Sequence, residues 1–182
     1  MDIFLVRHGE AAAAWGQSGD PGLSELGRQQ ASAAAQQLLP LVAADTRLVS
    51  SPLARAQETA EPLASALGVA VSLDDAFREL PAPVPLEQRS GWLKTFLRQR
   101  WEQQSTELLA WREQAMEHLL GIEGSAVVYT HFMVLNAIVG QLQEQPETVV
   151  YLPDNASITR LRRHDTGFEL VELGAQLETV IN

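Results

Sequence analysis

Two histidines and two arginines stand where their side chains could act together on an anion. Arg7 and His8 follow the first short apolar run of the chain, Arg55 lies just beyond a Ser-Ser-Pro sequence after the second, and His131 follows the third. Guanidinium groups present paired N–H donors that match phosphate oxygens, and an imidazole can act as a nucleophile or a hydrogen-bond donor. These residue types in this arrangement predict a site for a phosphoryl group.

The segments that precede these side chains are typical of strands in one parallel sheet. Short apolar runs suit strands buried on both faces, and helical segments alternate with them. The predicted strands are 3–6, 48–49 and 126–130, and the helices are 25–39, 54–67 and 132–142. In open α/β sheets, ligands bind at the carboxyl ends of the strands, where the four side chains stand. We therefore predict a single α/β domain over residues 1–182, with helices on both faces of the sheet.

Several local features carry finer expectations. Ser24 is the expected N-cap of the first helix, and Ser51 is expected to cap the second, with Pro52 as its first residue and a kink at Pro62. Further along, two amphipathic helices are expected, and two alternating segments flank a turn of sequence DTG, which indicates a hairpin. Those helices are 88–104 and 106–120, and the paired segments are 157–163 and 168–173.

The aromatic residues of the middle region have two interpretations. Their spacing is typical of core packing, and the alternative is a wall over the site, built with neighbouring basic residues. The aromatic residues are Trp92, Phe96, Trp101 and Trp111, and the basic residues are Arg89, Arg98 and Arg100. His118 and His164 are expected on the surface.

The overall composition excludes several classes of protein. The 182 residues hold 13 Lys and Arg against 23 Asp and Glu, a net charge of −10, which disfavours nucleic acid and anionic membrane surfaces as partners. The chain has no Cys, so disulfides, zinc–thiolate sites and thiol nucleophiles are excluded. The opening MDIFLVRHGE does not resemble a signal peptide, and no apolar run approaches ~20 residues. A cytoplasmic protein without a membrane segment is expected.

Five motifs, in order, resemble the histidine phosphatase (phosphoglycerate mutase-like) superfamily. They are LVRHGE, LSELGRQQA, SSPLARAQETA, VVYTH and NASITRL. The resemblance implies a three-layer αβα sandwich with a mostly parallel, mixed central sheet. It also implies a phosphohistidine mechanism without a metal or other cofactor. By motif position, His8 is the nucleophile, Arg7, Arg55 and His131 bind the phosphoryl oxygens, and Glu79 is the general acid. Glu10 and Ser50 are expected to steady the His8 loop.

Three departures from the family pattern surround this predicted site. Ala11–Ala14 stand where small polar residues are usual, with Gln17 or Ser18 as candidates to replace them. A Pro-rich sequence, PAPVP, follows Leu80, and Phe132-Met133 replaces the usual Gly-Gly after His131. The last change is expected to narrow the pocket and make its wall more apolar.

The sequence leaves several functions open. The first is a phosphomonoester hydrolase that acts on a small phosphorylated substrate, and the second is a protein phosphohistidine phosphatase. A mutase comes third, and a non-catalytic phosphate-binding module is the alternative from another class. Two histidines and a glutamate could hold a metal, but two arginines at the same place disfavour a cation. Nothing in the sequence indicates an oligomeric state.

Overall fold

A computed structural model of the chain describes residues 1–13 and 19–178. Within them the short apolar runs form the centre of a six-stranded sheet with the order β3-β2-β4-β1-β5-β6. The parallel strands are β1 (Asp2–Arg7), β2 (Arg47–Ser50), β3 (Val71–Leu73) and β4 (Ala126–Thr130). An antiparallel hairpin, β5 (Ile158–His164) and β6 (Gly167–Glu172), completes the sheet beside β1.

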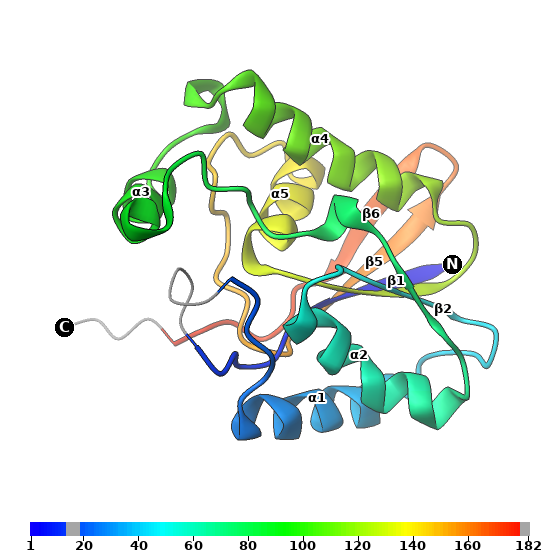
Figure 1. Cartoon of the computed structure of the whole chain (residues 1–182). Helices are drawn as coiled ribbons and strands as arrows, with labels where there is room; N and C mark the ends of the chain where they lie inside the picture. Colours follow the sequence, from blue (N-terminus) through cyan, green and yellow to red (C-terminus); the bar gives the residue numbers. More distant parts are fainter. Residues whose placement is uncertain (14–18, 179–182) are drawn as a thin grey trace.

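Helices cover both faces of this sheet (Figure 1). One face carries α1 (Glu25–Leu38) and α2 (Ala54–Leu67), and the other carries α4 (Thr106–Gly121) and α5 (Phe132–Leu142). The short helix α3 (Arg89–Phe96) stands apart from the sheet, on the side where the parallel strands end. The rest of the helical structure consists of single 3₁₀ turns at Asp75–Phe77, Leu86–Gln88 and Trp101–Gln103.

The alternation of side chains along the strands explains the two cores. Phe4 and Val6 of β1 pack toward α1 and α2, whereas Ile3 and Leu5 pack toward α4 and α5. All four are buried, so β1 has no polar face, as expected of a central strand covered on both sides. The predicted α/β class, the layers and the mixed sheet are confirmed.

Two predictions about helix ends were wrong. Leu53, not Ser51, is the N-cap of α2, and its side chain makes no capping hydrogen bond. Pro52 therefore lies outside the helix. The Ser51 hydroxyl accepts the Leu53 N–H, which holds the turn rather than the helix end. The helix then runs without a break from Ala54 to Leu67, through Pro62.

The helix expected at 88–104 is much shorter than predicted. The α-helix ends at Phe96, and the backbone that follows is bound by Thr148, far along the chain. The Thr148 hydroxyl donates to the Phe96 carbonyl at 2.7 Å, and the Thr148 N–H donates to the Gln99 carbonyl at 3.0 Å. The second expected helix and the hairpin are present.

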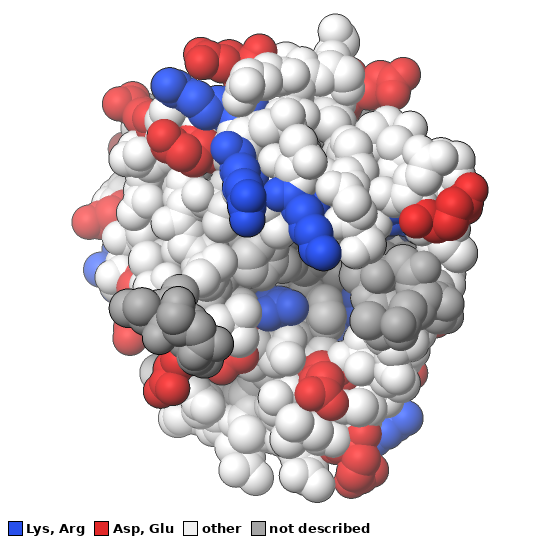
Figure 2. Space-filling model, turned by 90° about the vertical axis from the view of Figure 1, so that its left-hand side faces the viewer, with Lys and Arg blue, Asp and Glu red and all other residues white. Residues whose placement is uncertain are grey.

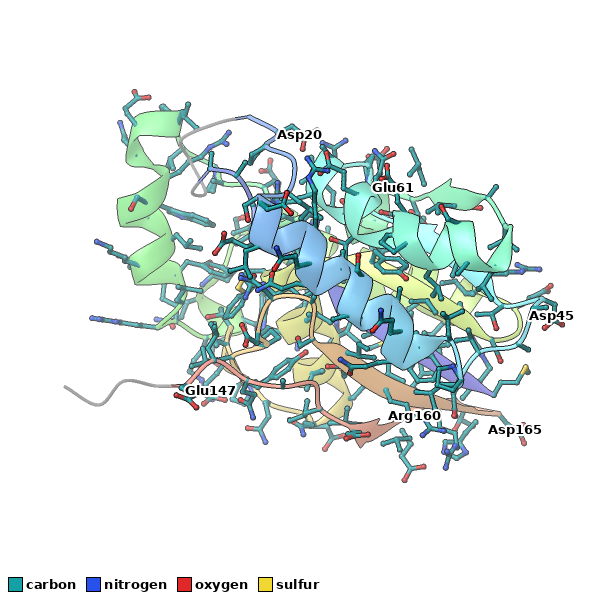
Figure 3. The ribbon with its side chains drawn as sticks, turned by 90° about the horizontal axis from the view of Figure 1, so that it is seen from below. Asp20, Asp45, Glu61, Glu147, Arg160 and Asp165 are labelled. Carbon is teal, nitrogen blue, oxygen red and sulfur yellow. The ribbon has the colours of Figure 1, made fainter. Side chains whose placement is uncertain are left out.

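The topology brings the carboxyl ends of β1, β2 and β4 together. Arg7 is in register with Thr130, and Ser50 is in register with Tyr129. The turns that hold Asp45 and Asp165 lie at the far end of the molecule from α3 (Figure 3). Among the described residues, no helix is long and apolar enough to cross a membrane.

Candidate active site

His8 lies at the end of β1 with one ring nitrogen already occupied. Its Nδ1 is 2.6 Å from the Gly9 carbonyl oxygen, and its Nε2 is 3.2 Å from Nε of Arg55. A carbonyl can only accept and a guanidinium can only donate, so Nδ1 carries the proton and Nε2 is the free base. Burial, and then the Arg55 charge, lower the pKa of His8 from 6.5 to about 3. The imidazole is therefore neutral at pH 7, with Nε2 available as a nucleophile.

Two glycines allow the His8 loop to lie directly on the start of α1. A Cβ on Gly9 would stand 2.5 Å from the Gly27 carbonyl oxygen, and a Cβ on Gly27 would stand 2.1 Å from the backbone carbonyl oxygen of Glu10. The Glu10 carboxylate accepts the Ser24 hydroxyl at 2.6 Å, and Ser24 in turn accepts the Gly27 N–H as the helix cap. The expected role of Glu10 in steadying this loop matches these contacts.

The two arginines reach the site from different elements. Arg7 at the end of β1 donates to the Pro153 carbonyl at 2.8 Å, and its guanidinium lies over the Phe132 ring at 5.4 Å. Arg55, in the first turn of α2, is buried and donates to His8. Thr59 ties α2 to the His8 loop, since its hydroxyl accepts the Gly9 N–H and donates to the Arg55 carbonyl. Both guanidiniums line one cavity with His8.

His131 is fully buried beside His8, with 5.2 Å between the ring centroids. Its Nε2 is 2.7 Å from the Ser51 hydroxyl, which already accepts the Leu53 N–H. The hydroxyl can donate to Nε2 or use its second lone pair to accept from Nε2–H, and His131 Nδ1 has no hydrogen-bond partner. Burial lowers the pKa of His131 well below 6.5. The ring is therefore neutral, and it lies beside His8 without lining the cavity.

Ser51 and Ser50 differ from their expected roles. The sequence suggests Ser51 as a helix cap and does not reveal its contact with His131. The signal that could have suggested this contact is a hydroxyl next to one strand end, when histidines follow two neighbouring strands. Ser50 was expected to steady the His8 loop, but its hydroxyl donates to the Ser51 carbonyl at 2.8 Å. Ser50 therefore supports the Ser51 turn instead.

Glu79 is held over the N-terminus of α5. Its Oε1 accepts the Leu80 N–H at 2.9 Å, and its Oε2 is 3.4 Å from the Met133 nitrogen. The preceding backbone is fixed by two donors, because the Thr130 hydroxyl bonds the Phe77 carbonyl and the Trp111 indole bonds the Arg78 carbonyl. Burial raises the pKa of Glu79 above its ordinary value, against the opposing effect of its hydrogen bonds and of Arg55. A carboxyl group in this setting can carry a proton closer to neutral pH.

His8, Arg7, Arg55 and Glu79 line a cavity of about 810 Å³ that opens beside α3, whereas His131 lies behind His8 and does not line it. Its charged lining residues are four arginines and two glutamates, a net +2 on a chain of net −10: Arg7, Arg55, Arg78, Arg89, Glu10 and Glu79. Figure 2 shows a hollow with basic side chains inside it and along one rim. Among the described residues, no cluster of three or more metal-ligating side chains is present.

The middle region contributes both core and wall. Phe96 and Trp101 are buried in an aromatic cluster with Trp92 and Trp111, so the core interpretation holds for these rings. The cavity wall comes from other residues of α3 and its end, Arg89, Leu93 and Leu97, and Arg98 and Arg100 take no part in it. Phe132 and Met133 line the cavity, as expected. Gln17 and Ser18, the proposed replacements for polar loop residues, lie outside the described residues.

Comparisons with known proteins agree with this architecture. A family model of the histidine phosphatase superfamily (branch 1) matches residues 3–176. A protein of Erwinia tasmaniensis named probable phosphoglycerate mutase GpmB is 31% identical, over 94% of this chain and 85% of its own.

Solved structures of similar fold include two phosphatases. A mycobacterial glucosyl-3-phosphoglycerate phosphatase superimposes with a TM-score of 0.73 and 25% identity, over 96% of this chain and 99% of its own. A phosphoserine phosphatase of Entamoeba histolytica gives a TM-score of 0.74 at 23% identity, over 96% and 97% of the two chains. YhfR of Bacillus stearothermophilus gives 0.78 at 21% identity, over 93% and 95%.

Proposed function

The chain belongs to the histidine phosphatase superfamily, and on that premise we propose that it is a phosphomonoester hydrolase that needs no metal and forms a phosphohistidine on His8. The observation that carries this proposal is the pair of contacts that the two ring nitrogens of His8 make, from which its tautomer follows. Gly9 fixes the proton on Nδ1, so Nε2 presents its lone pair next to Arg55. The proposed substrate is a small phosphorylated molecule.

In the first half-reaction, Nε2 of His8 attacks phosphorus as the ester oxygen leaves in line. The N–P bond forms and the P–O bond breaks, while Arg7 and Arg55 neutralise charge on the three remaining oxygens. The Arg55 Nε–H that meets Nε2 in the free protein then turns to a phosphoryl oxygen. We assign His131, whose ring lies 5.2 Å from that of His8, as a further donor through Nδ1–H, in the tautomer in which the Ser51 hydroxyl donates to Nε2.

Glu79 carries the proton that each half-reaction needs. In the first, its protonated carboxyl group gives the proton to the departing alkoxide. In the second, the resulting carboxylate takes a proton from water, which attacks phosphorus and releases inorganic phosphate and neutral His8. A pKa raised by burial suits this alternation, because it favours the protonated form that the first half-reaction needs.

The Glu79 carboxyl group also favours a phosphate ester over a phosphoramidate as the substrate. A nitrogen leaving group needs less proton donation than an alkoxide, whereas this chain holds a carboxyl group of raised pKa against the cavity. A mutase must retain and turn a second phosphoryl group. Of the outer arginines that line the cavity, Arg78 is already paired with Asp75 at 3.1 Å, which leaves only Arg89 among the described residues to meet such a group.

Release of inorganic phosphate from phenyl phosphate, measured in the presence of a chelator, tests the proposal. We expect turnover by the unmodified chain and its loss in His8→Ala. His118→Ala is the matched control, since His118 is exposed on α4, away from the cavity, and its loss leaves the chemistry intact. Normal turnover by His8→Ala would rule the proposal out, and phosphate binding without any turnover would favour the non-catalytic module.

A further inference from the structure

Helix α3 presents a single stripe of side chains to the active-site cavity. Arg89, Leu93 and Leu97 are spaced by four residues, the spacing that places side chains one above another on a helix, and all three line the cavity. The side chains between them in sequence, such as Lys94, do not line it. The stripe thus places one cation above two apolar groups.

The position of this stripe is fixed before any ligand arrives. Phe96 of α3 is buried and stacks on Trp92 with 5.0 Å between ring centroids, and Trp101 meets Phe96 edge-on at 5.7 Å. Thr148 bonds the Phe96 carbonyl and so anchors the end of the helix. A wall held by packing and hydrogen bonds can select a ligand without the cost of ordering itself.

Arg89 has no carboxylate partner within residues 1–13 and 19–178. Its Nε is enclosed by protein without a hydrogen-bond partner, and no carboxylate among the described residues forms an ion pair with it. Arg78, the other outer arginine of the cavity, differs because both its Nε and Nη2 donate to Asp75. A partly buried guanidinium that lacks a partner is costly unless a ligand supplies one.

The cavity wall also carries several apolar side chains. Leu80, Phe132, Met133 and Leu177 line the cavity together with the two leucines of α3. Since Arg7 and Arg55 account for the charge of a bound phosphoryl dianion, Arg89 is left for a second negative charge on the ligand. The cavity of about 810 Å³ also exceeds what a phosphoryl group alone requires.

We propose that Arg89, Leu93 and Leu97 form a leaving-group subsite that selects phosphate esters with an apolar body and a second anionic group, such as a carboxylate. This inference rests on the proposed function only in placing the phosphoryl group at His8. The apolar body lies against the leucines, and the anion pairs with the Arg89 guanidinium.

Binding of hydrolysis-resistant phosphonates tests the subsite independently of turnover. The probes are naphthylmethylphosphonate and its ring-carboxylated counterpart, with Kd measured by calorimetry. We expect the carboxylated probe to bind about tenfold more tightly to the unmodified chain, as a charge-assisted pair would give. Arg89→Gln should remove that difference and leave the Kd of the uncharged-ring probe within about twofold.

Three further variants complete the test. Leu93→Asn should weaken both probes, since it takes apolar surface from the wall. Lys94→Gln, one residue along the same helix and exposed, should change neither Kd. Equal Kd values for the two probes in the unmodified chain, or a difference abolished by Arg78→Gln but kept in Arg89→Gln, would overturn the subsite. A failure of the proposed hydrolase function would appear instead as absent turnover with these Kd differences intact.

Discussion

Acidification should destabilise the fold through the two buried imidazoles of the site. Burial and the neighbouring Arg55 lower the pKa of His8 to about 3, and burial lowers that of His131 well below 6.5. An unfolded chain takes up a proton at each of these positions as the pH falls through about 6.5, and the folded chain does not. The unfolded state therefore binds more protons, and the free energy of unfolding falls with falling pH.

The magnitude follows from the proton count. Each imidazole contributes a slope of about 1.4 kcal/mol per pH unit below the unfolded pKa, so the two together give about 2.7 kcal/mol. Glu79 acts in the opposite sense, because its raised pKa makes the folded state take up a proton at a higher pH than the unfolded state. Above the unfolded pKa of Glu79, this offsets the slope of the free energy of unfolding by at most about 1.4 kcal/mol per pH unit. Between pH 6 and 5 the free energy of unfolding should therefore drop by roughly 1.3 to 2.7 kcal/mol.

Urea unfolding at a series of pH values, followed by tryptophan fluorescence, measures this slope. His8→Asn and His131→Asn should each reduce it by about 1.4 kcal/mol per pH unit, because asparagine does not titrate. The exposed His118 and His164 are present in every variant, so their contribution cancels in the comparison. A free energy of unfolding that stays level between pH 6 and 5, or an undiminished slope in both variants, would refute the reasoning.

Three further predictions concern single residues. Glu79→Gln should lower kcat by about 10²- to 10⁴-fold for alkyl phosphates, measured as phosphate release. The loss should be far smaller for aryl phosphates with acidic leaving groups, which need less proton donation. Equal losses on both substrates would contradict the role of Glu79 as the acid. Ser51→Ala should lower kcat about tenfold with little change in KM, since His131 loses the donor that sets its tautomer. An unchanged kcat would speak against that tautomer. Gly27→Ala should lower the free energy of unfolding by about 3 kcal/mol, because the added Cβ would overlap the Glu10 backbone. The control is Gly91→Ala in α3, where the added Cβ meets open space. Equal urea midpoints for the two variants would disprove the steric argument.

Much of the fold follows from local sequence because local and tertiary preferences agree there. The runs at 3–6 and 126–130 are short, apolar and followed by polar residues, and such a run in an α/β chain has one favourable place, the middle of a parallel sheet. The motif-bearing residues then meet because parallel strands end at one edge. His8, Arg7 and Arg55 could accordingly be expected at one place, whereas Glu79 could be assigned only from the resemblance of its motif to the family; all four line the cavity.

The parts that sequence reasoning missed depend on distant partners. Ser51 has the local surroundings of a helix cap, and its partner His131 lies 80 residues away. The end of α3 is tied to Thr148, 52 residues beyond Phe96, a contact that no local propensity could indicate. The unpaired state of Arg89 is likewise a property of the assembled cavity, since its exposed and buried atoms are fixed only by packing.

The covalent step on His8 is the central claim, and it can be observed directly. Rapid mixing with a radiolabelled aryl phosphate, quenched in alkali within a single turnover, should trap phosphate on the protein in a form stable to base and labile to acid. Peptide mapping should place the label on Nε2 of His8, with no label on His8→Asn and normal labelling of His118→Asn. Turnover that proceeds at the full rate with no label on His8 would contradict the mechanism.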